Sequence, residues 1–222
     1  MMSDLEKVIA SLPYSKLTKR MPPAANALME RCLEYVDGEQ LYGLSFCPND
    51  DVTSFYWMAN TTEALQRRAE KWQSRIAEEH PDTTLTVQDS VDEFRFEPPD
   101  WSISESAFRE RGRKFRKAIK LCDHANAPIG RIWRKFQANC KDSADVIAYC
   151  PLVQKQLLDA MVDGLKKFDS NFDWSRVGGR DQFILLVFIP DGNPELVRDM
   201  ARRLNPPPVW EQFAASYYSD EE

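Results

Sequence analysis

The sequence predicts a single α+β domain in which helices flank a mixed, largely antiparallel sheet of about five strands. Two observations carry this prediction. The run Phe183–Ile189 has no charged or polar side chain, and turn-forming residues follow it at 190–193. A short apolar run rich in β-branched and aromatic residues is typical of a strand buried on both faces. Most other apolar side chains recur at helical spacing. We therefore expect Phe183–Ile189 to be the central strand, with strands on both edges and helices above and below.

Length and composition indicate a chain that can bury a real core. It has 222 residues, of which 43% are hydrophobic. No apolar run approaches the roughly 20 residues that a membrane helix needs, and residues 1–10 lack the apolar segment of a secretory signal. The net charge of -6 argues against a general binder of nucleic acids or membrane surfaces. These features predict a cytoplasmic protein with no membrane segment.

The cysteines are widely spaced and show no CxxC pattern. Most lie among apolar neighbours, so we expect buried, reduced thiols in a reducing compartment. The five are Cys32, Cys47, Cys122, Cys140 and Cys150.

The N-terminal part of the chain predicts two helical segments. Leu5–Leu12 is a short helical candidate, and Pro22-Pro23 separates it from the second segment. The apolar residues of Ala24–Val36 recur at helical spacing, and Gly38 stands where a helix commonly ends. We divide the chain into an N-terminal arm or helix at residues 1–23, a single domain at residues 24–218, and an acidic tail at residues 219–222.

A hairpin is predicted next along the chain, formed by the strands Leu41–Cys47 and Thr53–Ala59 with a short polar turn between them. Asn60, with Glu63 three residues later, predicts the start of a helix that stops at Pro81. Weak alternation of apolar residues within Thr83–Glu97 predicts one further strand.

The next segment predicts two helices. Ser102 with Glu105 matches a capping box. It precedes the helix Glu105–Leu121, whose apolar side chains fall on one stripe from Phe108 to Cys122. A second helix is predicted over Pro128–Cys140.

In the rest of the chain, the positions of the prolines determine where we expect helices to begin. Pro151 disfavours a helical residue before it, so we expect a strand at Val146–Cys150 and a helix at Pro151–Phe168. After the expected central strand come the helices Pro194–Leu204 and Val209–Tyr218.

Nothing in the sequence assembles a catalytic or metal site. The two histidines, His80 and His124, lie in polar segments without a metal-ligand spacing. Gly178-Gly179 precedes a strand, whereas a phosphate-binding loop comes after one, so a turn is expected there. We expect no cofactor and no catalytic residue, and hence a binding protein in place of an enzyme.

Charge is strongly segregated along the chain. Between Arg109 and Lys135 there are ten basic and two acidic residues, a net +8, which leaves -14 for the rest of the chain because the total is -6. Such a run is usually a solvated helix face. It could also pair with the acidic remainder or bind an anionic partner, and the candidate partner-binding residues are Arg109, Arg113, Arg116, Lys117 and Lys120.

A series of short motifs occurs in a fixed order along the chain. The motifs are Leu41–Phe46 before a turn and a strand, Ala59–Glu63 opening a helix, Trp101 before a long helix, Asp145–Tyr149 before another, Phe183–Ile189, and Arg202–Pro206 leading to Trp210 and Phe213. Together they resemble the bacterial family known as domain of unknown function 4303, over most of residues 25–215. The resemblance implies no catalytic residues. Such families often lie beside toxin genes, which implies immunity proteins that bind and block a cognate toxin.

The function we expect is therefore that of a cytoplasmic immunity-type protein that neutralises a bacterial toxin by stoichiometric binding. Segregated charge favours fast and specific association. Two alternatives stay open: a small hydrolase-like enzyme acting on a nucleotide-like substrate, and a nucleic-acid-binding adaptor that uses the basic helix. Nucleic acid is the less expected partner because the aromatic residues of this segment lie on apolar stripes.

Overall fold

The computed structural model describes residues 2–80, 82–190 and 192–217, and these residues form one four-stranded sheet with the order β3-β2-β1-β4. Strands β1 (Leu41–Pro48) and β2 (Phe55–Thr61) form the antiparallel hairpin that the sequence predicts. Strand β3 (Ile103–Ser104) is antiparallel to β2, whereas β4 (Ile184–Val187) is parallel to β1. The predicted class, a mixed sheet flanked by helices, is confirmed with four strands instead of about five.

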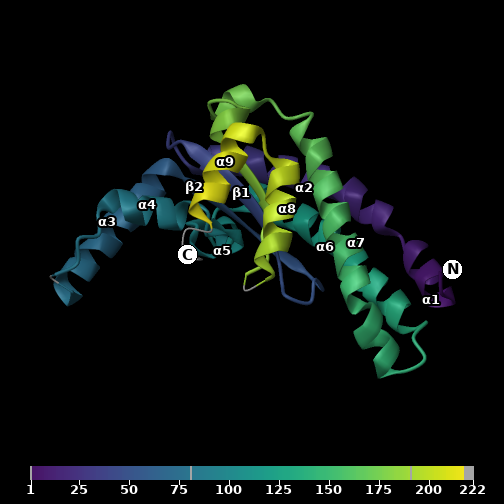
Figure 1. The fold of residues 1–222 in the computed structure, drawn as a ribbon. Coiled ribbons are helices and arrows are strands. Elements are labelled where there is room, and N and C mark those ends of the chain that lie inside the picture. Colours follow the sequence, from purple (N-terminus) through teal and green to yellow (C-terminus); the bar gives the residue numbers. More distant parts are fainter. Residues whose placement is uncertain (1, 81, 191, 218–222) are drawn as a thin grey trace.

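Helices make up most of the remaining described chain. In Figure 1, the two C-terminal helices (yellow) lie in front of the sheet, and the third and fourth helices project to one side of it. Short 3₁₀ turns occur at Pro98–Asp100, Trp174–Val177 and Arg180–Gln182. The helices are α1 Asp4–Ala10, α2 Tyr14–Tyr35, α3 Thr62–Glu79, α4 Val87–Arg95, α5 Glu105–Arg109, α6 Arg113–Gln137, α7 Ser143–Asp169, α8 Pro194–Leu204 and α9 Pro207–Ser216.

Strand β4 is buried on both faces but lies at the edge of the sheet, so the prediction of a central strand at Phe183–Ile189 is wrong in that respect. A side chain stands where the missing neighbour strand would pair. The Asn205 amide accepts a hydrogen bond from the backbone N–H of Leu185 (2.9 Å) and donates one to its carbonyl (2.8 Å). The backbone groups of Leu185 at this edge are thereby paired without a fifth strand.

Two other predicted strands are helical. Thr83–Glu97 contains α4, which Thr86 caps in a reciprocal box with Asp89. The apolar residues Val87, Val91 and Phe94 are spaced by four and three, which is a helical period. The same segment also alternates weakly, and the prediction followed that weaker pattern. Val146–Cys150 belongs to the first turns of α7.

Prolines lie inside three helices and do not end them. They are Pro22 and Pro23 in α2, Pro128 in α6, and Pro151 in α7. An internal proline costs about 3 kcal/mol in helix stability. Burial of long apolar stripes on these helices offsets that cost, as with Leu157 and Met161 in α7. The predicted boundaries at Pro22-Pro23, Pro128 and Pro151 are therefore wrong, and α2 crosses the division drawn between residues 23 and 24.

The predicted helix Glu105–Leu121 is interrupted. Gly112 has φ +99° and ψ -166°, a conformation open almost only to glycine, and it separates α5 from α6. Helix α3 also begins differently from the prediction, because Thr61 and not Asn60 caps it. Asn60 instead donates to the Tyr42 hydroxyl and accepts from Ser102.

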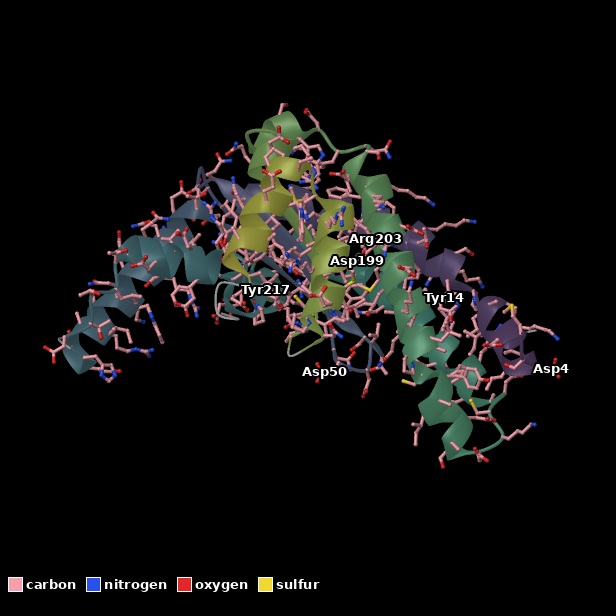
Figure 2. The ribbon with its side chains drawn as sticks, viewed as in Figure 1. Asp4, Tyr14, Asp50, Asp199, Arg203 and Tyr217 are labelled. Atoms are coloured by element: carbon pink, nitrogen blue, oxygen red, sulfur yellow. The ribbon has the colours of Figure 1, made fainter. Side chains whose placement is uncertain are left out.

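The C-terminal helices agree closely with the prediction. Asn193 caps α8, and a proline-rich break separates α8 from α9. Arg203 of α8 donates hydrogen bonds to Asp159 of α7 (2.6 Å) and to Asp199 of its own helix (3.2 Å). Figure 2 labels Arg203 and Asp199, which lie next to each other on α8. Pro81, Asp191, Tyr218 and the acidic tail 219–222, all named in the sequence predictions, lie outside the described residues.

The five cysteines are free thiols, of which Cys32, Cys47 and Cys122 are buried. Burial raises the pKa of the Cys47 thiol to about 12 and raises the pKa values of Cys32 and Cys122 as well. Within the described residues, no helix combines the length and the apolar character that crossing a bilayer requires.

Candidate partner-binding surface

Helix α6 has one face in the core and the opposite face in solvent. The side chains of Phe115, Ile119 and Cys122 are buried, and the helix packs beside α2. The predicted apolar stripe therefore faces inward, apart from its break at Gly112. The side chains on the outward arc are exposed, and we call them the basic face: Arg113, Lys114, Arg116, Lys117 and Lys120.

Among the residues that the structure describes, no side chain neutralises the basic face. None of its five side chains makes an ion pair or hydrogen bond to another residue that the structure describes. A surface hollow of about 700 Å³ lies among them. By contrast, Arg109 lies on α5, before the break at Gly112, and forms an ion pair with Glu105 of the same helix. The structure thus gathers four of the predicted site residues on α6 and sets Arg109 apart from them.

The first turn of α6 lacks the capping and acidic side chains that would stabilise the start of a helix. Gly112, at its N-cap, makes no side-chain cap, and the first turn contains no acidic residue. The first two residues of the helix are Arg113 and Lys114, and Arg116 follows two residues later. The N-terminus of a helix carries partial positive charge, so cations there are unfavourable, typically by about 0.3–1 kcal/mol each.

A groove adjoins the basic face where α2 lies against α6. Its volume is about 350 Å³, and apolar side chains of Ala27, Ala118 and Leu121 line it. Lys114 and Lys117 stand at the rim and are shared with the hollow of the basic face. The surface therefore combines unpaired positive charge with an apolar strip.

The other charged residues at this groove already have partners. Arg176 forms an ion pair with Glu30 and holds the pKa of that carboxyl below its ordinary value. Arg31 pairs with Glu34 on the same helix. Among the described residues that line the groove, Lys114 and Lys117 are thus the cations available to a partner.

The sequence predictions missed Lys114 and the groove. Lys114, Lys117 and Leu121 are spaced by three and four, so they share one helical stripe, and that spacing could have located the rim. The contribution of Ala27 could not be found in this way, because it depends on how α2 packs against α6.

No metal site is found within residues 2–80, 82–190 and 192–217, where no group of three or more His, Cys, Asp or Glu side chains could hold an ion. His124 contributes its backbone carbonyl to a hydrogen bond from Arg20 (2.9 Å).

Comparison with known protein families gives a match over most of the chain. The family described as Domain of unknown function (DUF4303) matches residues 22–206, a range that includes most of α2, all of α6 and the whole sheet. No curated protein and no solved structure matches the chain. The match covers far more than half of the sequence and agrees with the order of motifs along it. The chain belongs to the DUF4303 family.

Proposed function

We propose that this protein is a cytoplasmic immunity-type protein that neutralises a bacterial toxin by stoichiometric binding, and that the basic face of α6 docks an acidic surface of that toxin. The observation that carries the proposal is the cluster of unpaired cations at the N-terminal turns of α6.

The cluster lowers the stability of the isolated chain. Arg113 precedes Arg116 by three residues and Lys117 by four, and like charges at these spacings repel one another. The same cations also oppose the helix dipole. Local choices that work against stability are expected at functional sites. An acidic partner would relieve both kinds of repulsion, whereas a face that only contacts solvent gains nothing from the arrangement.

The adjoining groove supplies the second part of an interface. Protein interfaces combine charged or polar rims with an apolar centre that excludes water. Ala27, Ala118 and Leu121 offer such a strip beside Lys114 and Lys117. Long-range attraction would speed the encounter, and the apolar strip would slow dissociation.

A nucleic-acid partner is the second candidate, because the same cations could contact phosphates. The aromatic side chains of α6 argue against it. Phe115, Trp133 and Phe136 are all buried, so they offer no surface on which bases could stack.

Co-expression with the product of the adjacent gene tests the proposal. We expect that product to arrest growth when it is expressed alone, and the parent chain to restore growth. The variant Arg113→Glu/Arg116→Glu/Lys117→Glu should lose protection. The matched control Arg131→Glu/Arg134→Glu/Lys135→Glu makes the same charge change at exposed positions of the same helix and should keep it.

Misfolding would not explain the expected loss. Acidic residues favour the N-terminal turns of a helix, so the first variant should be at least as resistant to urea as the parent. A non-toxic neighbour, or full protection by the first variant, would contradict the proposal.

A further inference from the structure

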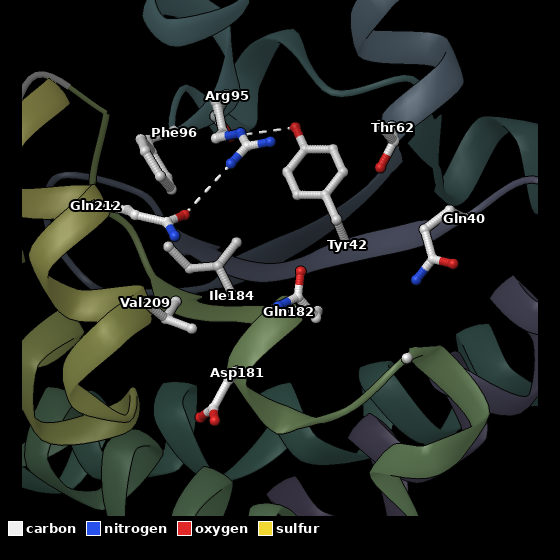
Figure 3. Close-up of a pocket in the computed structure, with 11 residues that line it drawn as sticks. Gln40, Tyr42, Thr62, Arg95, Phe96, Asp181, Gln182, Ile184, Val209 and Gln212 are labelled. Carbon is white, nitrogen blue, oxygen red and sulfur yellow. Dashed lines mark hydrogen bonds between the residues drawn. The ribbon is translucent and has the colours of Figure 1, made fainter.

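A polar cavity of about 260 Å³ lies away from the basic face, at the ends of the sheet where β1 and β4 begin. Tyr42 of β1 and Ile184 of β4 line it, and α9 closes one side with Val209 and Gln212 (Figure 3). Arg95, at the end of α4, reaches into the same space. The cavity thus collects residues from segments far apart in sequence, and its size suits a small organic molecule.

The Arg95 guanidinium is the one cationic side chain among the residues that line this cavity, and no carboxylate pairs with it within the described chain. Its Nη1 donates one long hydrogen bond to the Gln212 side-chain oxygen (3.3 Å), and its Nε is buried without a partner. Figure 3 shows Asp181 on the opposite side of the cavity from Arg95. Three other half-buried arginines differ, since Arg68, Arg180 and Arg203 each pair with an aspartate.

The position of Arg95 is fixed by the sheet. The Tyr42 hydroxyl donates to the Arg95 backbone carbonyl (3.1 Å) and accepts from Asn60 (3.1 Å). The guanidinium lies 5.8 Å from the centre of the Tyr42 ring. A charge that is partly removed from water and lacks a counter-ion favours the binding of an anion.

The other lining residues define the rest of the ligand. Gln212 turns its oxygen toward Arg95, which leaves its N–H₂ group able to donate, and Thr62 and Gln182 add further polar groups. The buried side chains of Phe96, Ile184 and Val209 supply an apolar wall. A single guanidinium matches the charge and the planar geometry of one carboxylate, whereas a phosphate dianion would remain half uncompensated.

We propose that this cavity binds a small monocarboxylate with a flat apolar body, its carboxylate on Arg95 and Gln212 and its body against Ile184 and Val209. The site is separate from the basic face, so it does not depend on the proposed function.

Amide NMR titration with benzoate tests the proposal, with benzamide as the uncharged match and inorganic phosphate as an anion of different shape. Benzoate should shift the amides of residues 40–42, 95–96, 182–184 and 209–212 in a saturable manner, with a dissociation constant on the order of 1 mM for so small a probe. Benzamide and phosphate should each bind about tenfold more weakly or worse.

Two variants locate the contact. Arg95→Gln should weaken benzoate binding by about tenfold or more, and Gln212→Leu should weaken it while leaving the arginine in place. Arg131→Gln, an exposed position on α6, should bind as the parent does. If Arg95→Gln alters the spectrum beyond the cavity, Gln212→Leu decides the result.

Three results would overturn the inference. They are no saturable shift with benzoate up to about 10 mM, equal binding of benzoate and benzamide or phosphate, and unchanged benzoate affinity in both cavity variants.

Discussion

Single side chains close the parts of this fold that backbone pairing leaves open. Asn205 pairs with both polar groups of Leu185 and donates to Ala201 as well (2.8 Å). Arg180 donates to the carbonyls of Phe183 (2.5 Å) and Leu204 (2.6 Å), and it forms an ion pair with Asp169. These two residues hold β4 in place at the edge of the sheet.

Replacing Asn205 with alanine should therefore destabilise the protein markedly. The change leaves the backbone groups of Leu185 without their partners at a half-buried edge, which costs about 2 kcal/mol or more. Urea unfolding measures the difference. The control Asn139→Ala removes an exposed side-chain hydrogen bond at the end of α6 and should change the free energy of unfolding by less than about 0.5 kcal/mol. Equal effects of the two changes would show that Asn205 does not close the edge.

Glu97 makes stability depend on pH. Burial, with the negative charges of Asp100 and Glu93, raises the pKa of its carboxyl from 4.5 to about 7. The folded state therefore binds this proton more tightly than the unfolded state does. The contribution is fully present below a pH of about 4.5 and is lost as the pH rises through about 7.

The neutral variant Glu97→Gln isolates this effect. Since Glu97 is half-buried, we expect a gain of about 1–2 kcal/mol over the parent at a pH of about 8 and little gain at a pH of about 5. Urea unfolding at the two pH values gives the comparison, and exposed Glu78→Gln serves as the control. A gain that is the same at both values would mean that Glu97 does not titrate in this range.

At the scale of elements, Gly112 divides what would otherwise be one helix. Helix α5 ends before it and α6 begins after it, and this break separates Arg109 from the basic face. An added Cβ at Gly112 would meet nothing within 4 Å, and the same holds for Gly130 in the middle of α6. The two positions differ in backbone conformation, since Gly112 has φ +99°.

Alanine at these two glycines should have opposite effects. Gly112→Ala should lower the free energy of unfolding by about 1–3 kcal/mol, because the left-handed conformation strains any residue with a Cβ. Gly130→Ala should raise it by about 0.5–1 kcal/mol, because alanine favours a helix interior over glycine. Thermal unfolding of both variants checks the pair. A stabilising Gly112→Ala would mean that the chain can continue as one helix from α5 into α6.

The sequence predicts helices and strands well where two local signals agree, and poorly where a boundary rests on a single signal. The β1–β2 hairpin has strand composition and a turn, and α8 has both an Asn193 cap and an early proline. Pro151 was a lone signal, and the buried stripe of α7 overrides it. Strand β3 is two residues long and is formed only through pairing with β2, which no local pattern reveals.

At the scale of the molecule, the sequence located the basic face but not what surrounds it. The stripe Phe115–Cys122 showed which side of α6 would be buried, and so which side would carry charge. The groove beside it and the cavity at Arg95 each need packing between distant segments, of which the sequence alone gives no sign.

At the scale of the whole molecule, net charge is segregated along the chain: the segment 109–135 carries a net +8 and the remainder a net -14. A partner with an acidic patch would be drawn to α6, and attraction of this kind acts mainly on the association rate. A basic partner would instead approach the acidic remainder, and reversing the charges of α6 would leave its association unchanged or faster.

The association rate with the proposed toxin partner, measured across salt concentrations, tests this account most directly. For Arg113→Glu/Arg116→Glu/Lys117→Glu we predict association about tenfold slower than the parent at low salt, with a salt dependence that shrinks or inverts. The control Arg131→Glu/Arg134→Glu/Lys135→Glu should stay close to the parent. Association of the first variant that is as fast as the parent's, or faster, would contradict the assignment of the basic face as the docking surface.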